Sequence, residues 1–182
     1  MKVQKLPKFG QQSKLLSFDI ESNGLHGEAF AVGAVIVDAK RAVIDTFVGR
    51  CAIEAEVDEW VQKNVLPVLK NIPVTHKSYG ALRSAFWDWF TVAQKKTDYV
   101  VVSNGYPVEY GFLLACQHDA IDGRYWEHPF PILDATSVAL GAHKDVSALK
   151  LRIAAELSGQ AHNPVYDAQL AARMVLDVLL GA

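Results

Sequence analysis

Two carboxylates stand two residues apart in a largely apolar stretch, Ser17-Phe18-Asp19-Ile20-Glu21. Side chains two residues apart on a β-strand point to the same face, so Asp19 and Glu21 would form a pair. Burying two like charges is costly unless a cation compensates them, which makes a divalent metal ion one explanation of the pair. The alternative is a strand end that opens into water beside the turn Ser22-Asn23-Gly24.

Two further acidic residues each begin a helical pattern. Apolar residues follow Glu109 and Asp167 at the i+4 and i+7 positions, so each carboxylate would start the stripe that faces the core. Pro107 and Pro164 precede them at spacings that suit the first position of a helix. Compensation of the helix dipole on a half-exposed first turn would explain either residue alone. Together with the strand pair, however, they place four acids at one edge of a sheet.

His162 stands five residues before Asp167, with Asn163 as the expected N-cap of the helix that Pro164 begins. Its side chain would therefore hang from the loop above the first turn of that helix. An imidazole with an ordinary pKa of ~6.5 is suited to accept a proton from water near neutral pH. We expect the other histidines to be surface residues without a catalytic role.

Hydrophobic periodicity predicts strands and helices that could position these residues. Three β-rich runs separated by turn residues indicate an antiparallel meander, and the middle run is apolar on both faces, as in an interior strand. The order of elements predicts an α/β protein with a mixed sheet, three antiparallel strands plus parallel strands, and helices on both faces. The expected strands are residues 15–21, 29–37, 42–51, 99–103 and 131–133, and the expected helices are residues 57–63, 79–94, 107–120, 147–157 and 164–180.

Length and composition indicate one globular unit. The chain has 182 residues, 51% of them hydrophobic, which we divide into a loose leader (residues 1–13) and a single domain (residues 14–182). The net charge of −2 excludes a general basic field for coating nucleic acid. Two cysteines provide neither a disulfide framework nor a paired zinc motif, which favours a cytoplasmic protein. The longest apolar run, residues 30–37, is far shorter than the ~20 residues of a membrane span.

Three segments of the chain resemble the motifs of one family, the DEDDh 3′-to-5′ exonucleases. This family includes the polymerase III proofreading subunit, oligoribonuclease and RNase T. The resemblance extends over residues 15–180 in the family's order and approximate spacing, and it implies a ribonuclease H-like fold. The matching segments are Phe18-Asp19-Ile20-Glu21-Ser22-Asn23-Gly24-Leu25, Ser103-Asn104-Gly105-Tyr106-Pro107-Val108-Glu109-Tyr110-Gly111-Phe112-Leu113 and His162-Asn163-Pro164-Val165-Tyr166-Asp167-Ala168.

The resemblance implies a reaction and a cofactor. Two Mg²⁺ or Mn²⁺ ions would be held by Asp19, Glu21, Glu109 and Asp167, with His162 as the general base. The substrate would be single-stranded DNA or RNA with a free 3′ end, or a 3′ overhang, and the products nucleoside 5′-monophosphates. Related free-standing enzymes are often homodimers, so a homodimer is one expected state. The residues implied in substrate binding are Ser22, Gly24, Leu25, Asn104 and Tyr106.

Two points leave alternatives open. Leu25 would pack against the terminal base by resemblance, but it would equally suit an ordinary core position beside a turn. The family has aspartate where this chain has Glu109. The longer side chain would either reach a metal ion through a bound water or disable the metal site. In the second case the protein would be a catalytically degenerate module that binds nucleic-acid 3′ ends.

Overall fold

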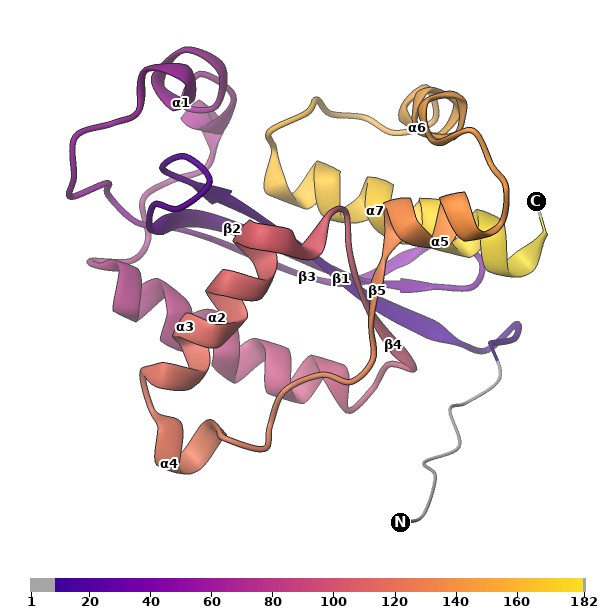
Figure 1. Ribbon diagram of the computed structural model, residues 1–182, viewed down its shortest axis with the longest axis horizontal. Coiled ribbons are helices and arrows are strands. Elements are labelled where there is room, and N and C mark those ends of the chain that lie inside the picture. The colour runs from indigo at the N-terminus through magenta and orange to yellow at the C-terminus, as the bar shows by residue number, and fades with distance from the viewer. Residues whose placement is uncertain (1–8, 182) are drawn as a thin grey trace.

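The computed structural model describes residues 9–181, in which a central sheet is covered by helices on both faces (Figure 1). The strands are β1 (Lys14–Ser22), β2 (Ala29–Asp38), β3 (Val43–Arg50), β4 (Tyr99–Val102) and β5 (Ile132–Asp134). The helices are α1 (Glu59–Asn64), α2 (Tyr79–Gln94), α3 (Tyr110–His118), α4 (Ile121–Arg124), α5 (Ala135–Gly141), α6 (Val146–Ala154) and α7 (Pro164–Leu180), with a 3₁₀ turn at Val68–Asn71 and a helical turn at Gly105–Glu109.

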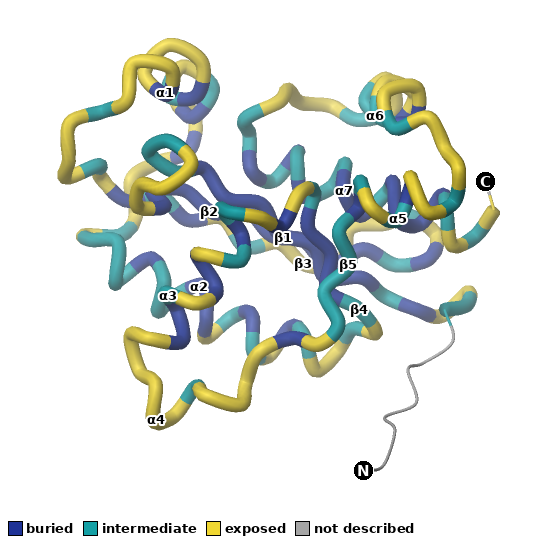
Figure 2. The backbone as a smooth tube through the Cα atoms, viewed as in Figure 1, coloured by how far each residue is buried: buried dark blue, intermediate teal, exposed yellow. Residues whose placement is uncertain are grey.

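The sheet has the order β3-β2-β1-β4-β5, with β1 at its centre. The pairs β1–β2 and β2–β3 are antiparallel, whereas β1–β4 and β4–β5 are parallel. The backbone of β1 and β2 is buried along almost its whole length (Figure 2). The predicted α/β class, the antiparallel meander and the mixed sheet are therefore confirmed.

The alternation of side chains on β1 divides the core into two layers. Leu16, Phe18 and Ile20 pack with α2 and α3 on one face of the sheet. Leu15 packs with α5, α6 and α7 on the other face. Because alternate residues of a strand share a face, Asp19 and Glu21 point toward the layer that contains α7. The fold thus places the carboxylate pair under the last helix of the chain.

The predicted helix at residues 107–120 is confirmed at its start. Within the helical turn Gly105–Glu109 only Tyr106 has a non-helical backbone (φ −108°, ψ 137°), so helical geometry begins at Pro107 and continues into α3, which ends at His118. The sequence analysis missed α4, α5 and the 3₁₀ turn, which are short elements of four to seven residues. Elements of this length bury too few residues to produce a clear periodic pattern.

The first eight residues of the expected leader lie outside the described residues. In the rest of that segment, the amide of Ser13 donates to the carbonyl oxygen of Gly10 (2.9 Å), and the Phe9 ring lies 6.4 Å from that of Tyr99, centroid to centroid. β1 begins directly after this turn. Within residues 9–181, no helix has the length and apolar character needed to cross a membrane.

Candidate active site

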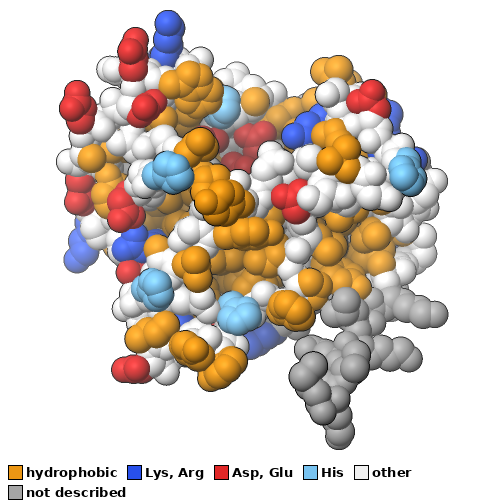
Figure 3. Space-filling view, viewed as in Figure 1, with side chains coloured by type: hydrophobic (Ala, Val, Ile, Leu, Met, Phe, Trp, Pro, Cys, Tyr) orange, Lys and Arg blue, Asp and Glu red, His pale blue; other side chains and the backbone are white. Residues whose placement is uncertain are grey.

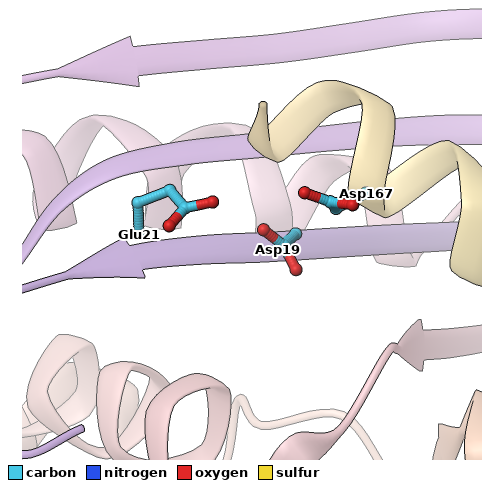
Figure 4. A group of neighbouring side chains, drawn as sticks. All are labelled: Asp19, Glu21 and Asp167. Atoms are coloured by element: carbon cyan, nitrogen blue, oxygen red, sulfur yellow. The ribbon is translucent and has the colours of Figure 1, made fainter. Parts of the chain in front are cut away.

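Three carboxylates from two elements meet beside the centre of the sheet. Oxygen atoms of Asp19 and Glu21 on β1 and of Asp167 on α7 all lie within 4.8 Å of one another (Figure 4). Asp19 and Glu21 are only 9% and 8% exposed. The two residues predicted as a strand pair therefore do share a face, and both side chains are largely buried there.

A glycine on β2 allows α7 to approach the sheet closely enough for this meeting. Gly33 pairs with Asp19 across the β1–β2 ladder. A Cβ atom at Gly33 would lie 2.3 Å from the backbone of Pro164 and Val165, at the start of α7. Any larger residue at this position would push away the first turn of α7, which carries Asp167.

The start of α7 is fixed by local capping, as the sequence predicted. The side chain of Asn163 accepts hydrogen bonds from the amides of Val165 and Tyr166, and Pro164 occupies the first turn. The amide of His162 donates to Asp167 Oδ2 at 2.7 Å. The carboxylate of Asp167 is thereby oriented by the same loop that carries the histidine.

His162 is held above the acidic group by contacts on several sides. Its backbone is left-handed (φ 67°), an uncommon conformation for a non-glycine residue. Its Nδ1 lies 3.8 Å from Glu21 Oε1. Its ring and that of Trp60 of α1 are packed in a T-shape, with the centroids 5.2 Å apart and the planes at 87°. The imidazole stays accessible, with 39% of its side chain exposed.

Burial and mutual repulsion raise the pKa values of these carboxyl groups. Burial is the first cause for Glu21, whose pKa rises to about 8, with repulsion from Asp167 and Glu109 as the next. The pKa of Asp19 rises well above its usual value, through burial and then the charge of Asp167. For Asp167, burial raises the pKa to about 6 although the hydrogen bond from His162 opposes the rise. The protein's own cations therefore leave much of this negative charge uncompensated.

Glu109 takes a separate place in the same cleft. It is 6% exposed and heads the buried face of α3, as predicted, but it is not one of the three residues whose oxygen atoms lie within 4.8 Å of one another. Its pKa rises to about 7, through burial first and also the charge of Asp134, although a backbone hydrogen bond opposes the rise. Its charge also raises the pKa values of Asp19 and Glu21. The four acids thus form one electrostatic unit with an inner group of three.

A cavity of about 660 Å³ opens above the carboxylates. The acids lie at the floor of this hollow, with hydrophobic side chains along its rim (Figure 3). Leu25 and Tyr106 are 67% and 81% exposed. Leu25 is therefore a surface residue, and the structure contradicts the alternative of a core position. The five residues expected to bind substrate all line this cavity, namely Ser22, Gly24, Leu25, Asn104 and Tyr106.

Two residues that the sequence analysis did not select support this site. Asp134, at the end of β5, accepts hydrogen bonds from the amides of Gly105 (2.9 Å) and Ser137 (2.7 Å), which joins the turn carrying Glu109 to the start of α5.

The second residue, Trp60, is positioned through the segment before α1. The Asn23 side chain donates to the carbonyl oxygen of Glu56 and accepts from the amide of Asp58, both at 2.8 Å. Of these two residues, only Asp134 could have been found from the sequence, because an aspartate before a helix is a typical N-cap.

The residues present fit a hard divalent cation. All three groups of the inner cluster offer carboxylate oxygens, the ligands that Mg²⁺ and Mn²⁺ prefer. Their raised pKa values indicate that negative charge is disfavoured in this group of carboxylates, and a bound cation would relieve that cost. The acidic cluster could therefore hold a metal ion.

Comparison with solved structures identifies the fold. The fold is similar to that of a 3′-exonuclease that specifically recognises the 3′ end of the histone mRNA stem-loop. The TM-score is 0.67 and the identity 11%, over 96% of this chain and 84% of that one. It is also similar to Exonuclease X in complex with 5′-overhanging duplex DNA, with a TM-score of 0.58, 13% identity and 92% of each chain covered. The protein thus has the α/β fold of these 3′-exonuclease structures.

A third similar structure is the zinc-bound form of E. coli Exonuclease I with single-stranded DNA. The TM-score is 0.61 and the identity 17%, over 93% of this chain but only 40% of that one, so the present chain spans about two fifths of Exonuclease I. No protein-family model and no curated protein matches the sequence. At these identities the comparisons establish the fold, and the activity has to be argued from the site.

Proposed function

We propose that the protein is a metal-dependent 3′-to-5′ exonuclease that releases nucleoside 5′-monophosphates from single-stranded or 3′-overhanging nucleic acid. The observation that carries this proposal is the group of three carboxylates within 4.8 Å of one another, with raised pKa values, at the floor of an open cleft. Uncompensated acids cost stability, which is tolerated where a cation and an anionic substrate meet.

In this proposal Asp19, Glu21 and Asp167 hold two Mg²⁺ or Mn²⁺ ions, with Glu109 contributing from the adjacent wall. Such ions would activate a water molecule and stabilise the leaving 3′-oxygen in an in-line displacement. His162 accepts the proton of the attacking water through its exposed imidazole. Two contacts support this role. The ring of Trp60 packs against the imidazole, and the hydrogen bond from the backbone amide of His162 to Asp167 fixes the loop that carries it.

The rim of the cleft would bind the terminal nucleotide. Leu25 and Tyr106 offer exposed apolar surface to a base, and aromatic rings stack on bases of any sequence. The Asn104 side chain is exposed and does not cap the following turn, which leaves its amide available to a polar group of the substrate. The turn at Ser22 and Gly24 would offer backbone groups to the sugar and phosphate. A cavity of about 660 Å³ gives these groups one shared space.

A 5′-labelled single strand incubated with Mg²⁺, Mn²⁺ or EDTA tests this proposal. We expect a ladder of products shortened from the 3′ end, with mononucleotides released and no cleavage in EDTA. A circular strand of the same composition is the control, because it has no 3′ end. Equal cleavage of the circle, or full activity in EDTA, would refute the proposal.

A module that only binds 3′ ends is the second candidate. The position of Glu109 outside the inner group of three favours it, because the fourth acid would then be unavailable to a second ion. This candidate predicts tight, metal-dependent binding of a single strand without product formation in the same assay. Binding and cleavage measured on one oligonucleotide therefore separate the two.

A further inference from the structure

A second cavity, of about 310 Å³, adjoins the cleft that contains the acids. The two cavities have four lining residues in common, so they lie on either side of one ridge. The volume of the second cavity is at the lower end of the range for small-ligand sites. A strand whose last nucleotide lies in the cleft would therefore find a binding space for the next nucleotide. The shared residues are Ser22, Leu25, Pro107 and Val108.

The ridge between the two cavities is held by the turn that carries Leu25. The amide of Asn23 donates to the carbonyl oxygen of Glu28 (3.1 Å), which closes this turn. A Cβ atom at Gly27 would lie 2.0 Å from the carbonyl oxygen of Asn23, so the two sides of the turn are in close contact. The turn therefore keeps Leu25 between the two cavities.

The walls of the second cavity combine apolar surface with an ion pair. Ala29, Val108 and Phe112 contribute apolar surface, which suits the flat faces of a nucleobase. Arg83 of α2 and Glu28, the residue before β2, contribute charged groups. Arg83 Nη1 donates to Glu28 Oε2 at 2.8 Å. Apolar walls with a few fixed polar groups are typical of a site that binds a heterocycle and orients it.

Arg83 holds Glu28 firmly because a second carboxylate fixes the guanidinium group. Its Nε and Nη2 donate to the two carboxylate oxygens of Asp119, at 2.7 and 3.0 Å. The side chain of Arg83 is 15% exposed, whereas that of Glu28 is 55% exposed. The three bonds use three of the five N–H groups of arginine. Within residues 9–181 these two side chains form no other hydrogen bond, so Glu28 Oε1 and two N–H groups of Arg83 remain for a ligand.

An acceptor beside a donor discriminates among the bases. Glu28 and Arg83 are bonded to each other, so the acceptor Oε1 and the remaining donors stand side by side. Guanine is the one base whose Watson–Crick edge carries two adjacent N–H donors, at N1 and N2, next to a carbonyl acceptor, O6. Arginine is a typical donor to O6 of guanine, and carboxylates accept from the amino groups of bases. In an unpaired strand this edge of the base is available to a protein.

We propose that the second cavity binds the base of the second nucleotide from the 3′ end, and that Glu28 and Arg83 select guanine at this position. Glu28 would accept from N1 and N2, and Arg83 would donate to O6. The inference rests on the proposed function, since it takes the cleft as the place of the terminal nucleotide. Both residues determine specificity in this proposal and take no part in bond cleavage.

The test measures binding of 5′-labelled single strands by fluorescence anisotropy, with Ca²⁺ in place of Mg²⁺. Four thymine-rich strands differ only in the second base from the 3′ end. We expect the wild type to bind the guanine strand about tenfold more tightly than the other three, at the lower end of the range for a base read by two side-chain contacts. A fifth strand carries hypoxanthine, which lacks only the 2-amino group of guanine, and should bind about fivefold more weakly than the guanine strand.

Glu28→Gln tests the acceptor. Arg83 remains paired with Asp119 in this variant, so the fold should be kept, but an N–H donor replaces one carboxylate oxygen. We expect it to bind the guanine and hypoxanthine strands equally, with a preference for guanine over thymine of less than about twofold. Glu156→Gln is the matched control and should keep the wild-type preference. Glu156 is also an exposed carboxylate paired with a largely buried arginine, Arg173, but it lines neither cavity.

Binding and cleavage of the same strands separate this inference from the proposed function. Equal affinity of the wild type for all four bases, or a guanine preference that persists in Glu28→Gln, would overturn the roles of Glu28 and Arg83 whether or not the protein cleaves. A guanine preference without release of mononucleotides would refute the exonuclease proposal and leave the second cavity as the base-reading site of a 3′-end module. Failure to bind any strand would overturn both.

Thermal melting of each variant confirms that it is folded. The hypoxanthine strand tests the wild type directly, so the inference does not depend on the folding of Glu28→Gln. Equal binding of guanine and hypoxanthine by the wild type would exclude a contact between Glu28 and the 2-amino group.

Discussion

Neutralising Glu21 should stabilise the metal-free protein at alkaline pH and prevent its stabilisation by metal. Burial and the charges of Asp167 and Glu109 raise the pKa of Glu21 to about 8, from 4.5. The folded state therefore binds this proton more tightly than the unfolded state does. The contribution of protonated Glu21 is complete below pH 4.5 and is lost as the pH rises through about 8. Glu109 and Asp167 act with the same sign, through pKa values of about 7 and 6.

The magnitude follows from the size of the pKa change. One pKa unit corresponds to ~1.36 kcal/mol, so the rise at Glu21 sets a ceiling of ~4–5 kcal/mol at pH 8. The cleft is open to water and counterions, which screen part of this repulsion, so we expect ~2 kcal/mol. For a chain of this size ~1 kcal/mol changes Tm by ~2–4 °C. Metal-free Glu21→Gln should therefore melt ~4–8 °C above the wild type at pH 8.

The assay is thermal melting in EDTA and in Mg²⁺ across pH 5 to 8. At pH 5 Glu21 is protonated in the folded wild type, so the two proteins should have similar Tm values. Mg²⁺ at ~100 times its Kd should stabilise the wild type by ~2.7 kcal/mol at pH 8, and it should have little effect on Glu21→Gln. The gain from Mg²⁺ should decrease toward pH 5, because protons compete with the ion for the carboxylates.

Asp88→Asn is the control, because Asp88 is exposed on α2, away from the cleft. It removes the same charge and should show neither the alkaline stabilisation nor the loss of the metal response. If metal-free Glu21→Gln melts at or below the wild-type temperature at pH 8, repulsion among the carboxylates does not destabilise the metal-free protein. The acidic group would then have to be stabilised by something other than a metal ion.

Three further variants test the proposed roles of individual residues. His162→Ala should remain folded and bind metal but lose ~10²–10⁴ in kcat, and wild-type turnover across pH 6 to 9 would exclude it as the general base. Metal-titrated turnover should show Glu109→Asp no faster than the wild type and Glu109→Gln nearly inactive, whereas a tenfold gain in Glu109→Asp would favour a degenerate site. Asp134→Ser keeps an acceptor for Ser137 but leaves the buried amide of Gly105 unpaired. It should lose ~1–2 kcal/mol of stability and about tenfold in kcat with KM unchanged, and melting and kinetic measurements would show a purely structural role if kcat is retained.

Those parts of the fold and site that depend on local pattern could be predicted from the sequence. The shared face of Asp19 and Glu21 follows from the two-residue period of a strand, and the capped start of α7 follows from Asn163 and Pro164. The inward position of Glu109 follows from the spacing of the apolar residues after it. Each of these depends on fewer than about ten neighbouring residues, over which backbone geometry is strongly restricted.

The missed features depend on contacts between distant segments. Trp60 reaches His162 because Asn23 holds the loop before α1 through hydrogen bonds that span more than 30 residues of sequence. Asp134 ends a strand of only three residues, and its second hydrogen bond goes to Gly105, 29 residues earlier. No periodicity reports such pairs, since each is decided by where two loops meet after the sheet has formed.

The backbone around Glu109 explains why the length of this side chain should matter. The amide of Gly105 is tied to Asp134, and a Cβ atom at Gly105 would lie 2.2 Å from the Tyr110 ring, so that ring covers the turn closely. A turn fixed at both ends cannot move toward the cleft when its side chain is shortened. Glu109→Asp would therefore withdraw the carboxylate by about one bond length, ~1.5 Å, and a misplacement of ~1 Å can cost ~10²-fold in rate. The same rigidity would hold Glu109 apart from the inner carboxylates in a 3′-end module, so only the direction of the rate change distinguishes an adapted site from a degenerate one.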